Sequence, residues 1–196
     1  MSFYIGARKE NNKDMKAETK DIRVEKTEKA IKNAFLELRS QKPLEKITVK
    51  ELCCQACINK STFYSHYEDI YALSESMETE TVASVLNSIP HTQEYTFEKL
   101  DVFTKELCIA FVSHKSLINI LFSDKGHSYL ANKLETEIKK TIFHKYPELQ
   151  DNVEKNILLS YCVQGSYHAY VNNQDVEAEV LMHVIENIAK ALQPLY

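Results

Sequence analysis

Hydrophobic side chains recur along most of the chain at spacings of three and four residues, the period of an amphipathic helix. Over residues 24–39 this pattern comprises Ala30, Ile31, Ala34, Phe35 and Leu38. Pro43 ends it, because proline cannot continue an α-helix and also restricts the residue before it. We therefore predict a first helix over 24–39. Residues 1–20 carry mixed charges without a sustained apolar period and are expected to form a flexible arm.

Two short helices are predicted after this break. Thr48 suits an N-cap, with Glu51 three residues later as its capping-box partner. Cys57 and the next residue form a turn, and Asn59 is a second N-cap for a helix that continues to Tyr67. Two helices of this length joined by a tight turn have the dimensions of a helix-turn-helix.

The remainder of the chain has the same helical pattern. A fourth helix is predicted over 69–88, and residues 89–95 are interpreted as a hinge. Further amphipathic segments cover 96–112, 117–122, 127–146, 151–172 and 175–192. Because so few residues separate the last two segments, we expect them to pack antiparallel.

Composition supports an all-α fold, since the chain has 3 glycines and 4 prolines and therefore few of the turn signals of a β-rich protein. We expect a three-helix domain over 21–68 that contains the helix-turn-helix and a second helical domain over 69–196, linked by the fourth helix. The longest apolar run, 107–112, is far shorter than the roughly 20 residues of a membrane span, and residues 1–20 are too charged for a secretory signal. These features predict a cytoplasmic protein without a membrane partner.

Charge is unevenly distributed along the chain. Basic residues exceed acidic ones by 3 over residues 1–70, whereas acidic residues exceed basic ones by 7 over residues 71–196. Any polyanion that binds is therefore expected at the N-terminal third. The alternative on charge alone is a solvated Lys/Glu surface.

Three of the 5 cysteines, Cys53, Cys54 and Cys57, lie close together before the predicted third helix. A structural zinc site needs four ligands, and this segment supplies a single C-x-x-C pair. The helical phase places Cys53 on the buried face and Cys54 on the exposed one. Cys57 lies near a helix N-terminus, which lowers a thiol pKa, so a redox-sensing role for it stays an alternative.

Enzyme motifs are not evident in the sequence. It lacks a glycine-rich phosphate loop, an H-E-x-x-H pair and a nucleophile elbow, and its histidines are scattered. We expect no catalytic site, no metal and no cofactor.

The predicted third helix carries groups suited to nucleic acid. Lys60 suits guanine edges or phosphates, and Ser61 and Thr62 can bond bases or backbone. Tyr64 and His66 can reach phosphate oxygens, and Thr48 opens the preceding helix.

Residues 46–73, KITVKELCCQACINKSTFYSHYEDIYAL, resemble the DNA-binding domain of the TetR family of bacterial transcriptional regulators. The resemblance covers about fifty residues, 23–73. It implies base contacts from Lys50, Lys60, Ser61 and Thr62, and phosphate contacts from Thr48, Tyr64 and His66. Two positions depart from the family pattern: Cys57 replaces a glycine of the turn, and Ile70 replaces a lysine that contacts phosphate.

The final two segments, 151–172 and 175–192, carry apolar stripes that suit half of a four-helix bundle formed with a second copy. The stripes comprise Val153, Ile157, Tyr161 and His168 on the first segment and Val176, Val180, Val184, Ile188 and Leu192 on the second. We therefore predict a homodimer, whose symmetry requires a palindromic site on double-stranded DNA.

The resemblance further implies that 21–68 is a DNA-binding domain and that 69–196 is a regulatory and dimerisation domain. It also implies a repressor released by an unidentified small-molecule effector. Candidate ligand-binding residues are Phe103, Leu107, Phe111, Phe122, Tyr129, Tyr161 and His168. A protein that acts through protein partners without DNA is the alternative, because Ile70 removes one expected phosphate contact.

Overall fold

The computed structural model describes residues 4–90, 99–122 and 127–192, with side chains described from Ile22 onward. These residues form helices and turns only, so the all-α prediction is confirmed. The chain divides into two compact units, Met1–Glu75 and Ser76–Tyr196. The division falls inside one helix, whereas the sequence pattern predicted a domain boundary between residues 68 and 69.

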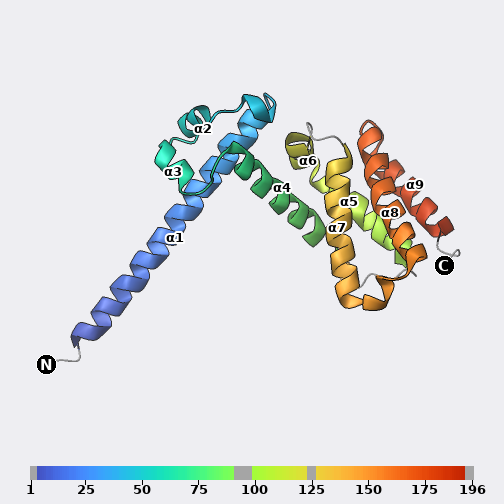
Figure 1. Cartoon of the computed structure of the whole chain (residues 1–196), viewed down its shortest axis with the longest axis horizontal. Coiled ribbons are helices and arrows are strands. Elements are labelled where there is room, and N and C mark those ends of the chain that lie inside the picture. Colours follow the sequence, from blue (N-terminus) through green and yellow to red (C-terminus); the bar gives the residue numbers. More distant parts are fainter. Residues whose placement is uncertain (1–3, 91–98, 123–126, 193–196) are drawn as a thin grey trace. The chain divides into compact units, whose positions relative to one another are not determined.

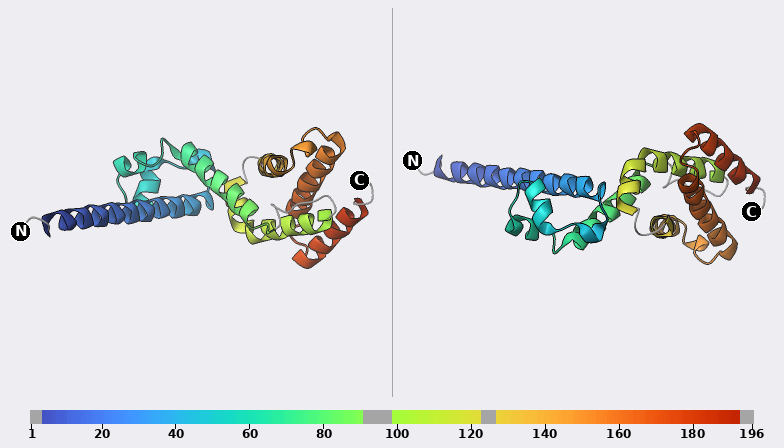
Figure 2. Two further views of the ribbon diagram at one scale, coloured as in Figure 1. Left: turned by 90° about the horizontal axis from the view of Figure 1, so that it is seen from below. Right: turned by 90° about the horizontal axis from the view of Figure 1, so that it is seen from above.

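The first unit contains α1 (Tyr4–Arg39), a short 3-10 helix (Leu44–Lys46), α2 (Val49–Gln55), α3 (Lys60–Tyr64) and the start of α4 (Ile70–Asn87). α2 packs against α1 and α3 against α2. Both short helices lie beside α1 in Figure 1 and in both views of Figure 2.

α1 is longer than the sequence pattern predicted, since it begins at Tyr4 rather than near residue 24. Residues 4–20, expected as an arm outside the helix, are helical here. The physical reason is that Lys, Glu, Ala and Arg dominate this stretch and have good helix propensity, so the helix continues past the end of its apolar face.

The core of the first unit forms where α1 meets the short helices. Ile31, Phe35 and Phe63 are completely buried. They are joined by Ala34, Leu38, Ile47, Leu52, Cys53, Ile70 and Leu73. The predicted apolar face of residues 24–39 is therefore the face that packs, with Ala30 at its half-buried edge.

The second unit contains the rest of α4, α5 (Leu100–Ser113), α6 (Lys115–Phe122), α7 (His127–Lys145), a 3-10 helix (Pro147–Leu149), α8 (Val153–Asn172) and α9 (Ala178–Leu192). α5 packs against both α8 and α9, and α7 packs against α8 (Figure 1). The predicted segments agree with these helices to within a few residues. The hinge expected at 89–95 falls mostly outside the described residues.

The connection between α8 and α9 is longer than predicted and runs over 173–177. It is a hydrogen-bonded turn, in which the Val176 N–H donates to the Asn173 carbonyl at 3.1 Å. The Val180 N–H then donates to the Glu177 carbonyl at 3.0 Å, which starts α9. Val176 therefore belongs to the turn rather than to the helix.

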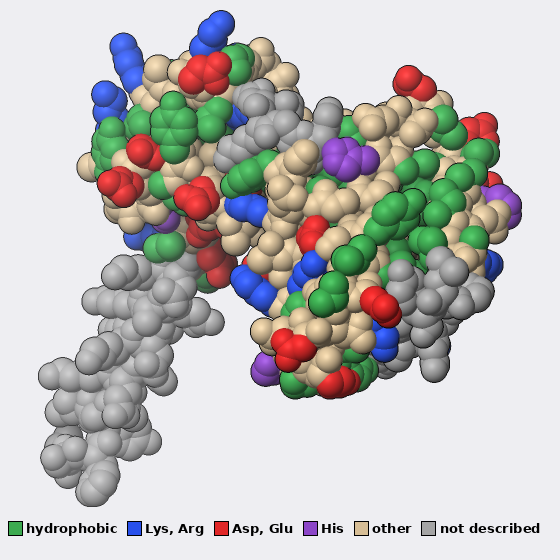
Figure 3. All heavy atoms as spheres, turned by 45° about the vertical axis from the view of Figure 1, so that its right-hand side comes forward, with side chains coloured by type: hydrophobic (Ala, Val, Ile, Leu, Met, Phe, Trp, Pro, Cys, Tyr) green, Lys and Arg blue, Asp and Glu red, His purple; other side chains and the backbone are tan. Residues whose placement is uncertain are grey.

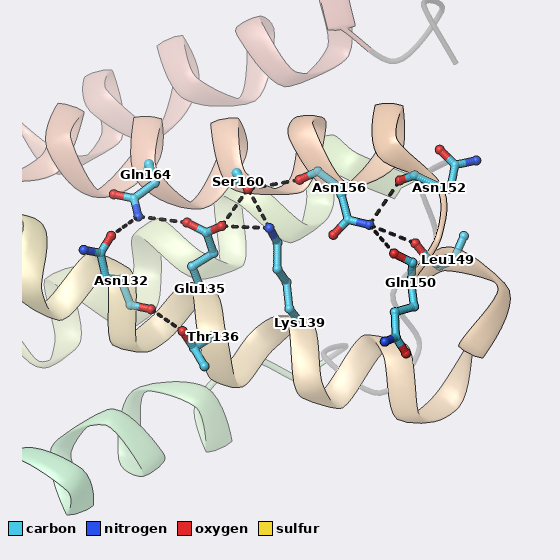
Figure 4. A network of polar contacts seen from close by, with 10 residues as sticks. All are labelled: Asn132, Glu135, Thr136, Lys139, Leu149, Gln150, Asn152, Asn156, Ser160 and Gln164. Carbon is cyan, nitrogen blue, oxygen red and sulfur yellow. Dashed lines mark hydrogen bonds and ion pairs between the residues drawn. The ribbon is translucent and has the colours of Figure 1, made fainter.

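A polar network joins α7 to α8 (Figure 4). The Ser160 hydroxyl donates to the Glu135 carboxylate at 2.6 Å, and the Lys139 ammonium lies 2.8 Å from the same carboxylate. Gln164 Nε2 donates to Glu135 at 2.8 Å and to Asn132 at 2.7 Å. Burial acts to raise the pKa of Glu135, but its hydrogen bonds outweigh that effect and hold the pKa below its ordinary value. The network therefore fixes α7 on α8 through an ionised carboxylate.

Among the helices that the structure describes, none is both long enough and apolar enough to cross a membrane.

Candidate nucleic-acid interface

α2 begins at Val49, and its N-cap is Thr48, whose side-chain oxygen accepts a hydrogen bond from the Glu51 N–H at 3.3 Å. This confirms the predicted N-cap. The Glu51 carboxylate is engaged elsewhere, because it accepts bonds of 2.6 and 2.5 Å from the Lys42 ammonium. The capping-box pattern assigned the Glu51 carboxylate to the N-cap. In the structure it forms an ion pair with Lys42, in the segment before α2.

The turn between α2 and α3 is a Schellman motif centred on Cys57. The Ile58 N–H donates to the Cys53 carbonyl at 3.0 Å, and the Cys57 N–H donates to the Cys54 carbonyl at 3.3 Å. Cys57 has a φ of 54°, in the left-handed region that favours glycine. The turn thus keeps the geometry expected of a glycine at this position, with a strained cysteine in its place.

α3 is shorter than predicted, because it ends at Tyr64 and residues 65–66 form a turn. Asn59 is its N-cap, and the Asn59 Oδ1 atom accepts the Thr62 N–H at 2.8 Å. The same oxygen accepts the hydroxyls of Ser61 at 2.6 Å and Thr62 at 2.9 Å. These two hydroxyls, predicted to contact DNA, therefore donate to the cap and keep their lone pairs as acceptors.

Phe63 anchors α3 to the first unit while the neighbouring side chains stay accessible. Its ring is completely buried and makes an edge contact with Tyr64, with centroids 5.5 Å apart. Tyr64 is 56% exposed, and Tyr67 is half-buried with its hydroxyl 3.5 Å from Glu28. Phe63 therefore packs α3 onto the unit, while the other residues of this helix stay at the surface.

The predicted DNA-contacting residues all reach the surface. Thr48, Lys50, Lys60, Ser61 and Tyr64 are exposed, whereas Thr62 and His66 are half-buried. Basic side chains project from this unit in Figure 3. α3 itself carries no acidic side chain. Its surface can therefore offer an ammonium, hydroxyls and a phenol to an anionic partner.

Ile70, which replaces the family's lysine, is the first residue of α4 and is 5% exposed. Its side chain belongs to the core and cannot meet a phosphate. The next residue, Tyr71, is 59% exposed, and the Asp69 carboxylate accepts the Ala72 N–H at 2.7 Å as the helix cap. Tyr71 is not among the DNA-contacting residues predicted from the sequence. Its position could have indicated it, because the residue after a buried one in the first turn of a helix faces a different side.

The cysteines separate into buried and exposed groups. Burial raises the pKa of both Cys108 and Cys162 to about 12, which makes them poor nucleophiles. Burial also raises the pKa of Cys53, whereas Cys54 and Cys57 are exposed. Within the described ranges, no cluster of three or more His, Cys, Asp or Glu side chains is placed to hold a metal ion.

The structure does not bring the seven candidate ligand residues around one cavity. Phe103, Leu107, Phe111 and Phe122 are buried in the core of the second unit. There Phe111 makes edge contact with Tyr167 at 5.3 Å between centroids. Tyr161 is exposed, and His168 is half-buried. Tyr129 alone of the seven lines a cavity of about 370 Å³ in the second unit.

This cavity lies between α4 and α7, entirely within the second unit. Its residues are Thr79, Val82, Ala83 and Leu86 from α4 and Tyr129, Asn132, Lys133, Thr136 and Glu137 from α7. Periodicity did not reveal this site, because the polar α7 residues read as a solvated helix face.

An exposed apolar surface covers one face of α8 and α9, and we call it the α8–α9 surface. It consists of Val153, Ile157, Tyr161, Val180, Val184 and Ile188, which are between 47% and 68% exposed. Figure 3 shows a band of hydrophobic side chains on this unit. Gly165 of α8 is also exposed, and a Cβ added there would meet nothing within 4 Å. A close approach at this glycine therefore does not occur within the chain.

Comparison with known proteins identifies a fold. No protein-family model matches the chain. No curated protein matches it either. The chain is similar to the crystal structure of a TetR transcriptional regulator from Streptococcus agalactiae 2603V, with 23% identity and a TM-score of 0.57. The match covers 88% of this chain and 98% of that one. The chain therefore has the fold of that regulator.

Proposed function

We propose that the chain is a transcriptional regulator of the TetR type, a cytoplasmic repressor that binds a palindromic operator as a homodimer and is released by a small molecule. The observation that carries this proposal is α3. It is held by buried Phe63 and capped by Asn59, and it displays Lys60 and Tyr64 on a helix without acidic side chains, within a fold shared with a TetR regulator.

Base recognition is assigned to Lys60, Ser61 and Thr62 of α3 and to Lys50 of α2. Lys60 donates to guanine edges, which are acceptors in the major groove. The Ser61 and Thr62 hydroxyls, already donating to Asn59, act as acceptors toward adenine or cytosine amino groups. Their bonds to the cap fix the direction of these acceptors before DNA arrives.

Phosphate contacts are assigned to Thr48, Tyr64 and His66, which flank α2 and α3. Tyr71 is added to them, because its exposed phenol directly follows position 70, where the family pattern has a lysine and this chain has Ile70. Such contacts fix the register on the duplex and carry no sequence information themselves.

Dimerisation through 151–172 and 175–192 is supported by the α8–α9 surface. Isolated exposed apolar residues are ordinary, but a contiguous apolar face on two neighbouring helices marks an interaction site. A second copy related by a two-fold axis presents the same face, and the open space at Gly165 allows close helix approach.

DNA binding is tested by fluorescence anisotropy with labelled genomic fragments at about 50 and 200 mM salt. We expect saturable binding to selected fragments that weakens steeply with salt. Lys60→Ala should remove the preference among fragments, whereas Lys115→Ala, which changes an exposed lysine of the second unit, should leave it intact. Equal, weak binding of every fragment by wild-type protein would refute the proposal.

The burial of Ile70 favours one alternative, a TetR-like protein that acts through protein partners without binding DNA. The same titration distinguishes the two, since the alternative predicts no DNA binding at either salt concentration. A second alternative, thiol control through exposed Cys57, predicts that oxidation changes operator affinity in wild type and not in Cys57→Ser.

A further inference from the structure

The cavity between α4 and α7 has the size and lining of a small-molecule site. Its volume of about 370 Å³ lies in the range of roughly 300–1,000 Å³ typical of ligand pockets. Val82, Ala83 and Leu86 of α4 and the ring of Tyr129 supply an apolar wall, while Asn132, Thr79 and Thr136 supply hydrogen-bonding groups. Such a site accommodates a mainly apolar molecule with one polar end.

Two charged side chains line the cavity, and their environments differ. The Glu137 carboxylate lies 2.5 Å from the ammonium of Lys140, so its charge is offset at the surface. The Lys133 ammonium lies 4.9 Å from the Tyr129 ring centroid and 3.8 Å from the Glu78 carboxylate. Lys133 is therefore the cavity charge whose ion pair is the longer and the more easily shared with a ligand.

The contact between Lys133 and Glu78 is longer than a charge-assisted hydrogen bond, which spans about 2.7–2.9 Å. Lys133 is 29% exposed and Glu78 is 0% exposed, so the ammonium is accessible from solvent and the carboxylate is not. An anion that enters the cavity can form a direct hydrogen bond with the ammonium without displacing a short one.

We propose that this cavity binds a small amphipathic carboxylate, with the carboxylate on Lys133 and the apolar tail along Val82, Leu86 and Tyr129. An ammonium ligand fits poorly, because Lys133 already occupies the face of the Tyr129 ring and would repel it. A neutral ligand of equal length gains the apolar contact alone. The occupant is thus a medium-chain or aryl-substituted carboxylic acid.

The proposal deepens the proposed function, on which its regulatory part rests. A bound carboxylate shares the Lys133 ammonium with the buried Glu78 carboxylate of α4. This weakens the attraction between α4 and α7. The network around Glu135 holds α7 on α8. α4 is therefore the helix that responds when its attraction to α7 weakens. α4 runs from Ile70, in the first unit, to Asn87, in the second, so a change at the cavity acts on a helix that both units share.

Isothermal titration calorimetry of the full chain tests the binding step, with octanoate as the probe and octan-1-ol and octylammonium as controls. We expect saturable binding of octanoate, at least about tenfold tighter than that of octanol, because a charge-assisted contact contributes about 1.4 kcal/mol or more. Octylammonium should bind more weakly than octanol. Equal affinity for octanoate and octanol, or no octanoate binding, would overturn the proposal.

Two substitutions test the roles of the charged pair, and they have opposite expected signs. Lys133→Met keeps the apolar stem and should weaken octanoate binding at least about tenfold. Glu78→Gln removes the competitor for the ammonium and should tighten binding at least about threefold. Lys145→Met is the matched control, since Lys145 also lies on α7 over a tyrosine ring, 5.4 Å from the Tyr146 centroid. Its affinity should equal that of wild type.

Thermal denaturation establishes that each variant folds. If Lys133→Met alone does not fold, the double variant Lys133→Met/Glu78→Gln, which removes both charges of this pair, replaces it with the same expected loss. Unchanged octanoate affinity in the lysine variant would overturn the assigned contact, and unchanged or weaker affinity in Glu78→Gln would overturn the shared ammonium.

Anisotropy with and without octanoate separates this inference from the proposed function. Octanoate binding by a chain that never binds DNA would refute the regulator and its release mechanism while retaining the site. DNA binding by a chain that does not bind octanoate would refute the site while retaining the regulator.

Discussion

Ile157→Ala should disrupt the proposed homodimer, because Ile157 lies in the α8–α9 surface and is 62% exposed in the single chain. Full burial of an isoleucine side chain contributes about 1.5–3 kcal/mol. Covering the remaining exposed fraction in a dimer therefore contributes about 1–2 kcal/mol per copy. A two-fold axis buries the residue twice, so the substitution should cost about 2–4 kcal/mol of association free energy.

This loss corresponds to a dimer dissociation constant raised about 30- to 700-fold. Sedimentation equilibrium over a range of protein concentrations measures that constant directly. Ile22→Ala is the matched control, since Ile22 is 46% exposed but lies on α1 in the first unit. Its dissociation constant should equal that of wild type.

Loss of association in Ile157→Ala has to be distinguished from loss of folding. Because the side chain is mostly exposed in the single chain, the substitution should leave the helical circular dichroism of the chain unchanged. A dissociation constant equal to that of wild type, or a wild-type protein that stays monomeric at high concentration, would refute the assignment of this surface to dimerisation.

Three further predictions concern single side chains. Cys57→Gly should raise the free energy of unfolding by about 1 kcal/mol in urea titrations, because glycine accepts the left-handed φ of 54°, whereas Cys57→Ala should not stabilise. Glu135→Gln should lower the unfolding free energy by about 1 kcal/mol above pH 5. Since the pKa of Glu135 is held below its ordinary 4.5, that difference should shrink as the pH falls below 4.5 through the folded-state pKa, and a difference independent of pH would contradict this. Tyr64→Phe should weaken selected and unselected DNA alike by about two- to tenfold in anisotropy titrations, because a phosphate contact carries no sequence information.

Local signals along the sequence predicted much of the first unit. Thr48 and Asn59 act as caps because an N-cap depends on one side chain and the amide groups just after it. The turn at Cys57 follows the same logic, since a tight turn between two helices requires a left-handed residue whatever its side chain.

Features that depend on distant partners were not predictable in this way. Glu51 binds Lys42 rather than its own cap, and no periodicity indicates which of two nearby donors a carboxylate selects. The extension of α1 to Tyr4 was missed for a different, local reason, because the prediction followed the apolar face alone, whereas helix propensity continues where that face stops.

The ligand candidates illustrate the same limit. Phe103 and Phe111 share the apolar period of any core residue, so the pattern alone does not separate a packed side chain from one that lines a cavity. The contact between Glu78 and Lys133 joins two helices far apart in the sequence, and each residue by itself reads as a solvated charge.

Selection of bound sequences from a random double-stranded DNA pool tests the regulator most directly. The account predicts that wild-type protein enriches one palindrome, and that Lys60→Met alters the recovered base at a symmetric pair of positions. Recovery of no common sequence by wild-type protein, or of the same palindrome by Lys60→Met, would contradict the central claim that α3 reads the major groove.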